Sequence, residues 1–276
     1  MTIYFVSIPY SLLFIFTLVF LQDSPRYLLK QCSAGEAQKS LNFIARVNGS
    51  PEELEKEEVR MFMAAEDKFT EKKGSMSPID VFRFPSIRTA SLAFCVLTLF
   101  IDLLYMAHSV IVDEIGFSPS LNQVLMSSSE MLSVLLLTVV VPFIRRSRAG
   151  QLLGVVGVLS SFVLMWIQVP SNCEQCPLKT IQLGLVMVAR FCIIFQYSVL
   201  LVVLSEFYPT SVKAMGVAVA TTFGLIGTII SEVLLTATRE MGRNPFLVIG
   251  IAFGCVIVVN HWTPETYGLE PQDQVE

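Results

Sequence analysis

The sequence predicts an all-α fold, a polytopic membrane helix bundle of about seven transmembrane helices with a helical polar segment after the first. Of the 276 residues, 53% are hydrophobic and only 15% are charged, and the mean hydropathy is +0.64. A water-soluble domain of this length does not carry so apolar a surface. The long runs are apolar on all faces, whereas the strands of a membrane barrel alternate apolar and polar residues. Helical spans are therefore expected.

The predicted spans are long apolar runs, because about 20 residues rising roughly 1.5 Å each cross a hydrocarbon core of about 30 Å. The first run lacks the basic stretch that begins a cleavable signal peptide, so no such signal is expected. In chain order the runs are residues 3–21, 89–107, 121–141, 151–169, 180–204, 215–236 and 245–259. The expected parts of the chain are a first transmembrane helix at 1–21, a helical linker at 22–88, a six-helix bundle at 89–260 and a polar tail at 261–276.

The charge distribution predicts which side of the membrane the linker faces. Residues 22–88 carry most of the charge in the chain, whereas the next predicted loop, 108–120, contains no Lys or Arg. By the positive-inside rule the linker faces the cytoplasm, or the matrix if the membrane is mitochondrial. The arginines after the third run fall on the same side, namely Arg145, Arg146 and Arg148. A multi-pass integral protein of the plasma membrane or an organellar membrane is expected, and the sequence does not decide between these membranes.

Several classes of function are disfavoured by the composition. The net charge is −4 and no basic stripe with interleaved aromatic residues occurs, so nucleic acid is not an expected partner. Only Cys173 and Cys176 lie close together among six cysteines, and with two histidines a zinc site has few ligands. This pair is either a disulfide or two free thiols. No nucleotide-binding loop and no Ser/His/Asp set can be assembled, so neither an enzyme nor a cofactor is expected.

Four ionisable residues lie inside the predicted spans, where each costs on the order of 2.5 to 3.5 kcal/mol. They are Asp102, Glu130, Arg190 and Glu232. One interpretation is an interhelical ion pair, joining Arg190 to Glu130 or Asp102, that only locks the bundle. The other is a polar cavity at mid-membrane that binds a solute or relays protons. Glu232 lies near the outer end of its span, where snorkelling is the simpler explanation.

Three motifs carry a resemblance to a known family. They are SEFYPTSVKAMGVAV at 205–219, SPRYLL at 24–29 and PET at 264–266. Together they resemble the signatures of the organic cation/anion transporter family of the major facilitator superfamily, and the match runs over nearly the whole chain. The resemblance implies that the predicted spans correspond to the family's sixth to twelfth, so that its first five spans and large extracellular loop are absent here.

That resemblance also implies partners, because a facilitator's solute cavity is shared between two halves. We expect a lipid bilayer, a complementary N-terminal half or unrelated membrane subunits, and a small organic solute. Glu130 and Arg190 match an acidic and a basic position of the family. Together with the charge of Asp102 and the aromatic rings of Tyr105 and Tyr197, the expected solute contacts are Glu130, Arg190, Tyr197, Asp102 and Tyr105, although the two tyrosines are equally explained by interhelical packing. The implied cytoplasmic gate consists of Glu206, Arg145, Arg146 and Lys213.

Two departures from the family pattern leave an alternative open. Residues 142–147, PFIRRS, replace the family's D-x-x-G-R-R loop, and Leu225 occupies the place of a charged residue before Ile226 and Gly227. The first hypothesis is a secondary-transporter-like protein for small organic solutes or ions, half of a transporter that needs a partner. The alternative is a transport-inactive accessory subunit of a larger membrane complex.

Overall fold

The regular structure of this protein is helical throughout the described residues. The computed structural model describes residues 2–20, 23, 25, 28, 34–49, 57, 59, 80–114, 118–140, 143–167, 177–208 and 212–266. No strand occurs among them, which confirms the predicted all-α class. The chain forms two compact units, Met1–Ser75 and Met76–Glu276, which are described in turn.

Two helices are described in the first unit. α1 spans Thr2–Phe20 and matches the first predicted span, and its residues Ile8–Thr17 form an apolar segment. α3 spans Ala34–Val47 and ends before Gly49, whose φ of 73° is the left-handed conformation that glycine adopts after a helix. A small apolar cluster lies on one side of α3 and consists of Leu28, Ala37, Val59 and the partly buried Leu41.

The second unit is a helical bundle whose members follow the remaining predicted spans. Its helices are α5 (Asp80–Arg83), α6 (Pro85–Glu114), α7 (Pro119–Val140), α8 (Arg146–Trp166), α9 (Pro177–Phe207), α10 (Lys213–Glu240) and α11 (Phe246–Asn260). Within the described part of the chain, 5 helices, α6 to α10, are long and apolar enough to cross a membrane. α11 has 15 residues and is about 22 Å long at roughly 1.5 Å per residue. The chain is therefore a multi-pass integral membrane protein.

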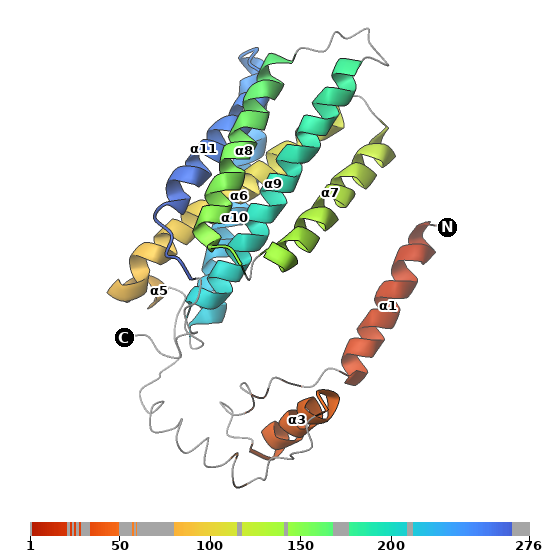
Figure 1. Ribbon diagram of the computed structural model, residues 1–276, viewed down its shortest axis with the longest axis vertical. Helices are drawn as coiled ribbons and strands as arrows, with labels where there is room; N and C mark the ends of the chain where they lie inside the picture. The colour runs from red at the N-terminus through yellow and green to blue at the C-terminus, as the bar shows by residue number, and fades with distance from the viewer. Residues whose placement is uncertain are drawn as a thin grey trace. The chain divides into compact units, whose positions relative to one another are not determined.

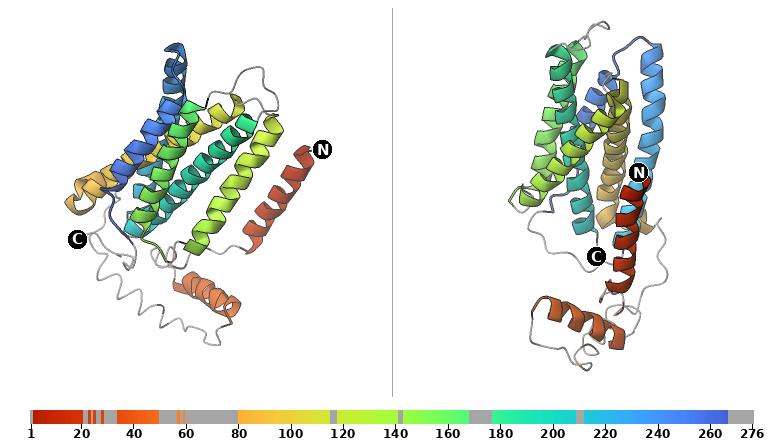
Figure 2. Two further views of the ribbon diagram at one scale, coloured as in Figure 1. Left: turned by 45° about the horizontal axis from the view of Figure 1, so that its top comes forward. Right: turned by 90° about the vertical axis from the view of Figure 1, so that its right-hand side faces the viewer.

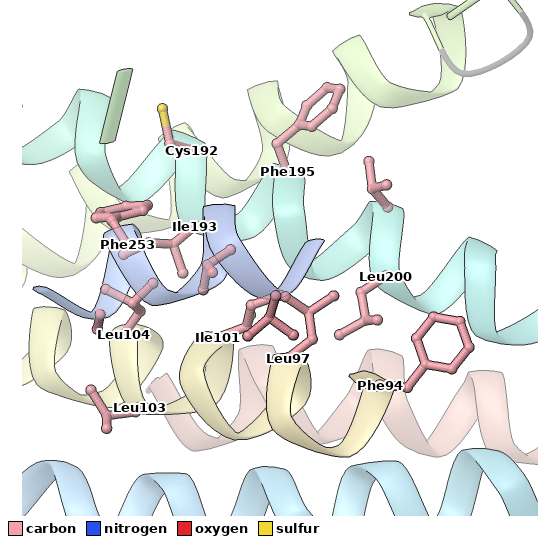
Figure 3. Close-up of a cluster of buried hydrophobic side chains, with 14 of the residues drawn as sticks. Phe94, Leu97, Ile101, Leu103, Leu104, Cys192, Ile193, Phe195, Leu200 and Phe253 are labelled. Carbon is pink, nitrogen blue, oxygen red and sulfur yellow. The ribbon is translucent and has the colours of Figure 1, made fainter. Parts of the chain in front are cut away.

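α6 and α9 form the centre of this bundle (Figure 1). α10 packs along α6, α7 packs along α9, and the paired helices α8 and α11 contact α9 and α6 respectively (Figure 2). The core lies where α6, α9 and α11 meet, and Figure 3 shows Phe94, Ile101, Ile193, Leu200 and Phe253 there. This arrangement leaves one side of α7 and one side of α10 without a neighbour among the described helices of the unit.

Glycines allow the closest helix contacts. A Cβ atom at Gly227 of α10 would lie 2.1 Å from the backbone oxygen of Leu99 in α6. One at Gly157 of α8 would lie 2.4 Å from the Phe253 ring of α11. Small residues of this kind let helix backbones approach closely inside a membrane. The α6–α10 and α8–α11 seams thus depend on positions that tolerate no side chain.

Hydrogen bonds fix the two ends of the bundle. At one end, called the far end, Asn244 Nδ2 donates to Met165 O at 3.2 Å and joins the loop after α10 to the end of α8. At the other end, Asn260 Nδ2 at the end of α11 donates to Ser147 O in α8 at 3.0 Å. This second end contains residues 143–148, 205–208, 212–213 and 260–266 and is called the basic end.

Candidate functional site

Arg190 is the centre of a polar cluster that joins three helices. It is only 1% exposed, and its Nε donates to Glu130 Oε1 on α7 at 2.9 Å while Nη2 pairs with the same carboxylate. Its Nη1 donates to Tyr105 O and Ser109 Oγ on α6, both at 3.0 Å. The guanidinium carbon also lies 3.9 Å from the centre of the Tyr105 ring. These bonds satisfy the buried charge and hold α6, α7 and α9 in one register.

Small hydroxylated residues allow α7 to approach α9 at this level. The sequence places serines at 127, 128 and 129 directly before Glu130. One turn later, the buried Ser133 donates through Oγ to Phe191 O on α9 at 3.2 Å. Because the small side chain of Ser133 permits close packing, the Glu130 carboxylate reaches the arginine of the neighbouring helix.

A hollow of about 770 Å³ lies beside this ion pair, between α6, α7 and α9. We call it the central hollow. The polar residues on its wall are Asp102, Tyr105, Ser127, Glu130, Tyr197 and Ser198. Four of the predicted solute contacts thus gather here. Arg190 does not line the hollow. It lies behind Glu130 and Tyr105 and holds both side chains in place through the ion pair and the ring contact.

Asp102 differs from Glu130 in having no ion pair or hydrogen bond to the described part of the chain. Its carboxylate lies against α10, since a Cβ atom at Gly224 would be 1.8 Å from Asp102 Oδ2. Arg190 therefore pairs with Glu130 and not with Asp102. The formal charges at the hollow are two carboxylates and one guanidinium, which leaves one uncompensated negative charge.

His108 lies on α6 beside the polar cluster. The prediction of a loop starting at this residue was wrong, because α6 continues to Glu114. His108 is buried, its Nε2 lies 2.9 Å from Val186 O on α9, and its Nδ1 has no partner among the described residues. His108 was not predicted as a site residue, because it was expected in a loop outside the membrane-spanning helices.

The basic end carries a second network. Arg146 Nη2 donates to Glu206 Oε1 at 2.6 Å, joining the start of α8 to the end of α9. The other oxygen of Glu206 accepts a hydrogen bond from Thr266 Oγ1 at 2.7 Å. The Glu265 carboxylate accepts from the backbone N–H groups of Arg146 and Ser147 at 3.0 and 3.3 Å, so it caps α8.

Of the predicted gate residues, Arg146 and Glu206 meet in this network and two others do not. Arg145 is exposed at the N-cap of α8 and makes no side-chain cap bond. Lys213 begins α10, half-buried, and no ion pair joins it to the described residues.

The bundle is closed beneath this network. The cavity between α6, α8, α9 and α11 has a volume of only about 20 Å³, which is room for one water molecule. Nearby, Tyr208 Oη donates to Ser91 Oγ on α6 at 2.9 Å. Burial raises the pKa of the Tyr208 hydroxyl to about 12, so it stays protonated and keeps donating at neutral pH.

The model of the sugar (and other) transporter family matches residues 2–274 of the chain. The chain belongs to this transporter family. It is 27% identical to solute carrier family 22 member 21 of Mus musculus over 93% of its length and 44% of that protein. It is 26% identical to organic cation/carnitine transporter 2 of Rattus norvegicus, covering 93% and 44%. It is 22% identical to solute carrier family 22 member 6 of Danio rerio, covering 98% and 47%.

These relatives confirm the resemblance to the organic cation/anion transporters and are transporters by name, not enzymes. The chain spans about half the length of the curated relatives that it matches. The sequence motifs located Glu206 and the PET segment, but the roles of Glu265 and Thr266 within PET were missed. Their signal was available, because a short polar motif just after a span end is suited to capping a neighbouring helix. Cys173 and Cys176 lie outside the described residues.

Proposed function

We propose that this chain provides the solute-binding part of a secondary transporter for small organic cations, with the central hollow as its site. One observation carries the proposal: Asp102 and Glu130 both line the hollow, while a single cation, Arg190, lies behind its wall. Charged groups at mid-membrane depth are costly unless they are paired or serve a solute. Glu130 is paired and Asp102 is not, so a cationic solute would supply the missing charge.

The aromatic groups on the wall support the same choice of solute. The Tyr105 ring already packs on the Arg190 guanidinium. Tyr197 lines the hollow on α9, and its ring is available to face a solute. An aromatic ring attracts a quaternary or protonated amine through its negative face, by about 0.5 to 2 kcal/mol. Tyr197 is therefore the proposed aromatic contact, and Asp102 the proposed ionic one.

The basic end is the proposed gate. The pair between Arg146 and Glu206 is partly exposed, with side-chain exposures of 12% and 31%. Because water reaches the glutamate side of the pair, we expect it to break and re-form while the bundle rocks. The predicted cytoplasmic position of this end would make it the inner gate. A solute or ion gradient would drive the cycle.

A complementary bundle is the proposed cover for the hollow. Apolar side chains on the free sides of α7 and α10 are strongly exposed, with Met131, Leu225 and Val233 each at 65%. Lipid would satisfy these side chains but not the carboxylates that line the hollow beside them. An N-terminal half of a facilitator, or an unrelated membrane subunit, would close the site.

Binding to the purified chain in lipid nanodiscs tests the solute class. We expect radiolabelled tetraethylammonium to bind and benzoate, an anion of comparable size, to bind at least ten-fold more weakly. Asp102→Asn should weaken tetraethylammonium binding about ten-fold, and Tyr197→Leu several-fold. The matched control is Glu232→Gln, which removes an exposed acidic residue from α10 away from the hollow and should change nothing. Tetraethylammonium binding unaffected by Asp102→Asn would overturn the assignment.

The alternative, a transport-inactive accessory subunit, rests on one separate observation. Leu225 occupies the position where the resemblance implies a charged residue, and it lies on the exposed side of α10. A chain retained for assembly would keep that face for contact with a neighbour. Mild-detergent purification distinguishes the two proposals: a stoichiometric set of unrelated subunits, with no solute binding, would favour the accessory function.

A further inference from the structure

A second hollow lies on the opposite part of the bundle, between α8 and α11 at the basic end. Its volume is about 750 Å³, and none of its lining residues belongs to the central hollow or to the gate. We call it the α8–α11 groove. The same two helices are joined at this end because Asn260 Nδ2 donates to Ser147 O, and the Asn260 side chain fills the space beside Gly150.

The mouth of this groove is basic and aromatic. Arg148, in the first turn of α8, is exposed and forms no ion pair with the described residues. His261 and Trp262 follow the end of α11 in a turn and line the same mouth, with Trp262 69% exposed. None of the described residues that line the groove carries a carboxylate. An arginine of this kind suits the oxygens of a phosphate, and tryptophan favours the headgroup level of a membrane.

The walls below the mouth are aliphatic. Leu152 and Val155 come from α8, and Ile257 and Val258 come from α11. Leu152 is 66% exposed and Val258 is 55% exposed. From Arg148 to Val155 the groove descends about 10 Å along the helix axis, at roughly 1.5 Å per residue. A cationic mouth above an apolar channel of this depth matches a phosphate headgroup followed by an acyl chain.

We propose that the α8–α11 groove binds an anionic phospholipid of the leaflet at the basic end. The phosphate and a second anionic group of the lipid lie at Arg148 and His261, Trp262 packs at the glycerol level, and one acyl chain follows Leu152 and Val258. A zwitterionic lipid fills the same channel but lacks the net negative charge that Arg148 attracts. One arginine near an anionic surface favours such a lipid about five-fold.

The two tryptophans of the chain allow a site-specific test. Trp262 lies in the groove, whereas Trp166 ends α8 at the far end. In Trp166→Phe protein, Trp262 alone reports on its neighbouring lipid. The 276-residue chain is reconstituted in phosphatidylcholine vesicles that contain a small fraction of brominated phosphatidylserine or brominated phosphatidylcholine. We expect quenching of Trp262 to indicate about five-fold tighter binding of the phosphatidylserine.

Matched variants decide whether the groove is responsible. Arg148→Gln with His261→Gln should reduce the preference below two-fold, and Arg148→Lys should keep most of it. Arg243→Gln removes an exposed arginine from the far end and should leave the preference unchanged. In Trp262→Phe protein, Trp166 should be quenched equally by both lipids. Equal quenching of Trp262 by the two lipids, or a five-fold preference that survives removal of Arg148 and His261, would overturn the proposal.

Discussion

The central hollow and the basic end use the same chemistry, an arginine paired with a glutamate on another helix, in different surroundings. At the hollow, Arg190 is 1% exposed and its pair borders about 770 Å³ of space. At the basic end, Arg146 and Glu206 lie above a cavity of about 20 Å³, and both oxygens of Glu206 accept hydrogen bonds. The difference teaches that the neighbouring packing, and not the ion pair, decides whether open space or a closed core lies beside the pair.

The largest effect in this comparison is expected from Arg190→Ala. Removal of one partner from a buried pair costs about 3–5 kcal/mol, because Glu130 loses its counter-charge. The melting temperature of the purified chain in detergent measures this loss. Adding Glu130→Gln to Arg190→Ala should recover part of the stability. A single variant as stable as the parent protein would show that the cluster does not hold the three helices together.

Gly227→Ala should have the next largest effect, since it disturbs the α6–α10 seam that positions Asp102. The added Cβ would lie 2.1 Å from the backbone oxygen of Leu99, and overpacking of this kind costs about 1–3 kcal/mol. Thermal unfolding again measures the change. The matched control is Gly254→Ala in α11, where nothing lies within 4 Å. That variant should be neutral or stabilising by up to about 1 kcal/mol, and a similar loss in both variants would contradict the prediction.

Glu206→Gln should cost less, about 1–2 kcal/mol, because the glutamine side chain keeps an oxygen that can accept a hydrogen bond from Arg146. A double-mutant cycle with Arg146→Gln isolates the coupling between the two side chains. If the Arg146–Glu206 pair stabilises the bundle as strongly as the Arg190 cluster, the measured coupling will instead reach about 3 kcal/mol. That outcome would remove the contrast between the two regions.

The smallest effect is expected from Arg145→Gln. Arg145 is exposed and makes no cap bond, and surface substitutions of this kind change stability by less than about 0.5 kcal/mol. Measured beside Arg146→Gln, it compares adjacent arginines in one motif. If both variants lost the same free energy of unfolding, the pairing of Arg146 with Glu206 would make no difference and the prediction would be wrong.

Much of the fold was predictable because hydropathy is a local property of the sequence. The helical class, the positions of the spans and the presence of charged residues within them at 130 and 190 all follow from runs of residues in order. The limit of α6 was less predictable, since the polar residues after His108 still form helix as far as Glu114. Their backbone groups are satisfied within the helix whether or not the side chains are apolar.

The sequence by itself determined which residues form helices and which charges must be accommodated inside them. Only the tertiary structure decided that Glu130 and not Asp102 pairs with Arg190, that Glu265 caps α8, and that Arg146 rather than Arg145 joins Glu206. The physical reason is that ion pairs and caps form over a few ångströms. Those distances depend on how each helix is rotated and shifted against its neighbours, and glycine contacts such as that of Gly227 with Leu99 set that register.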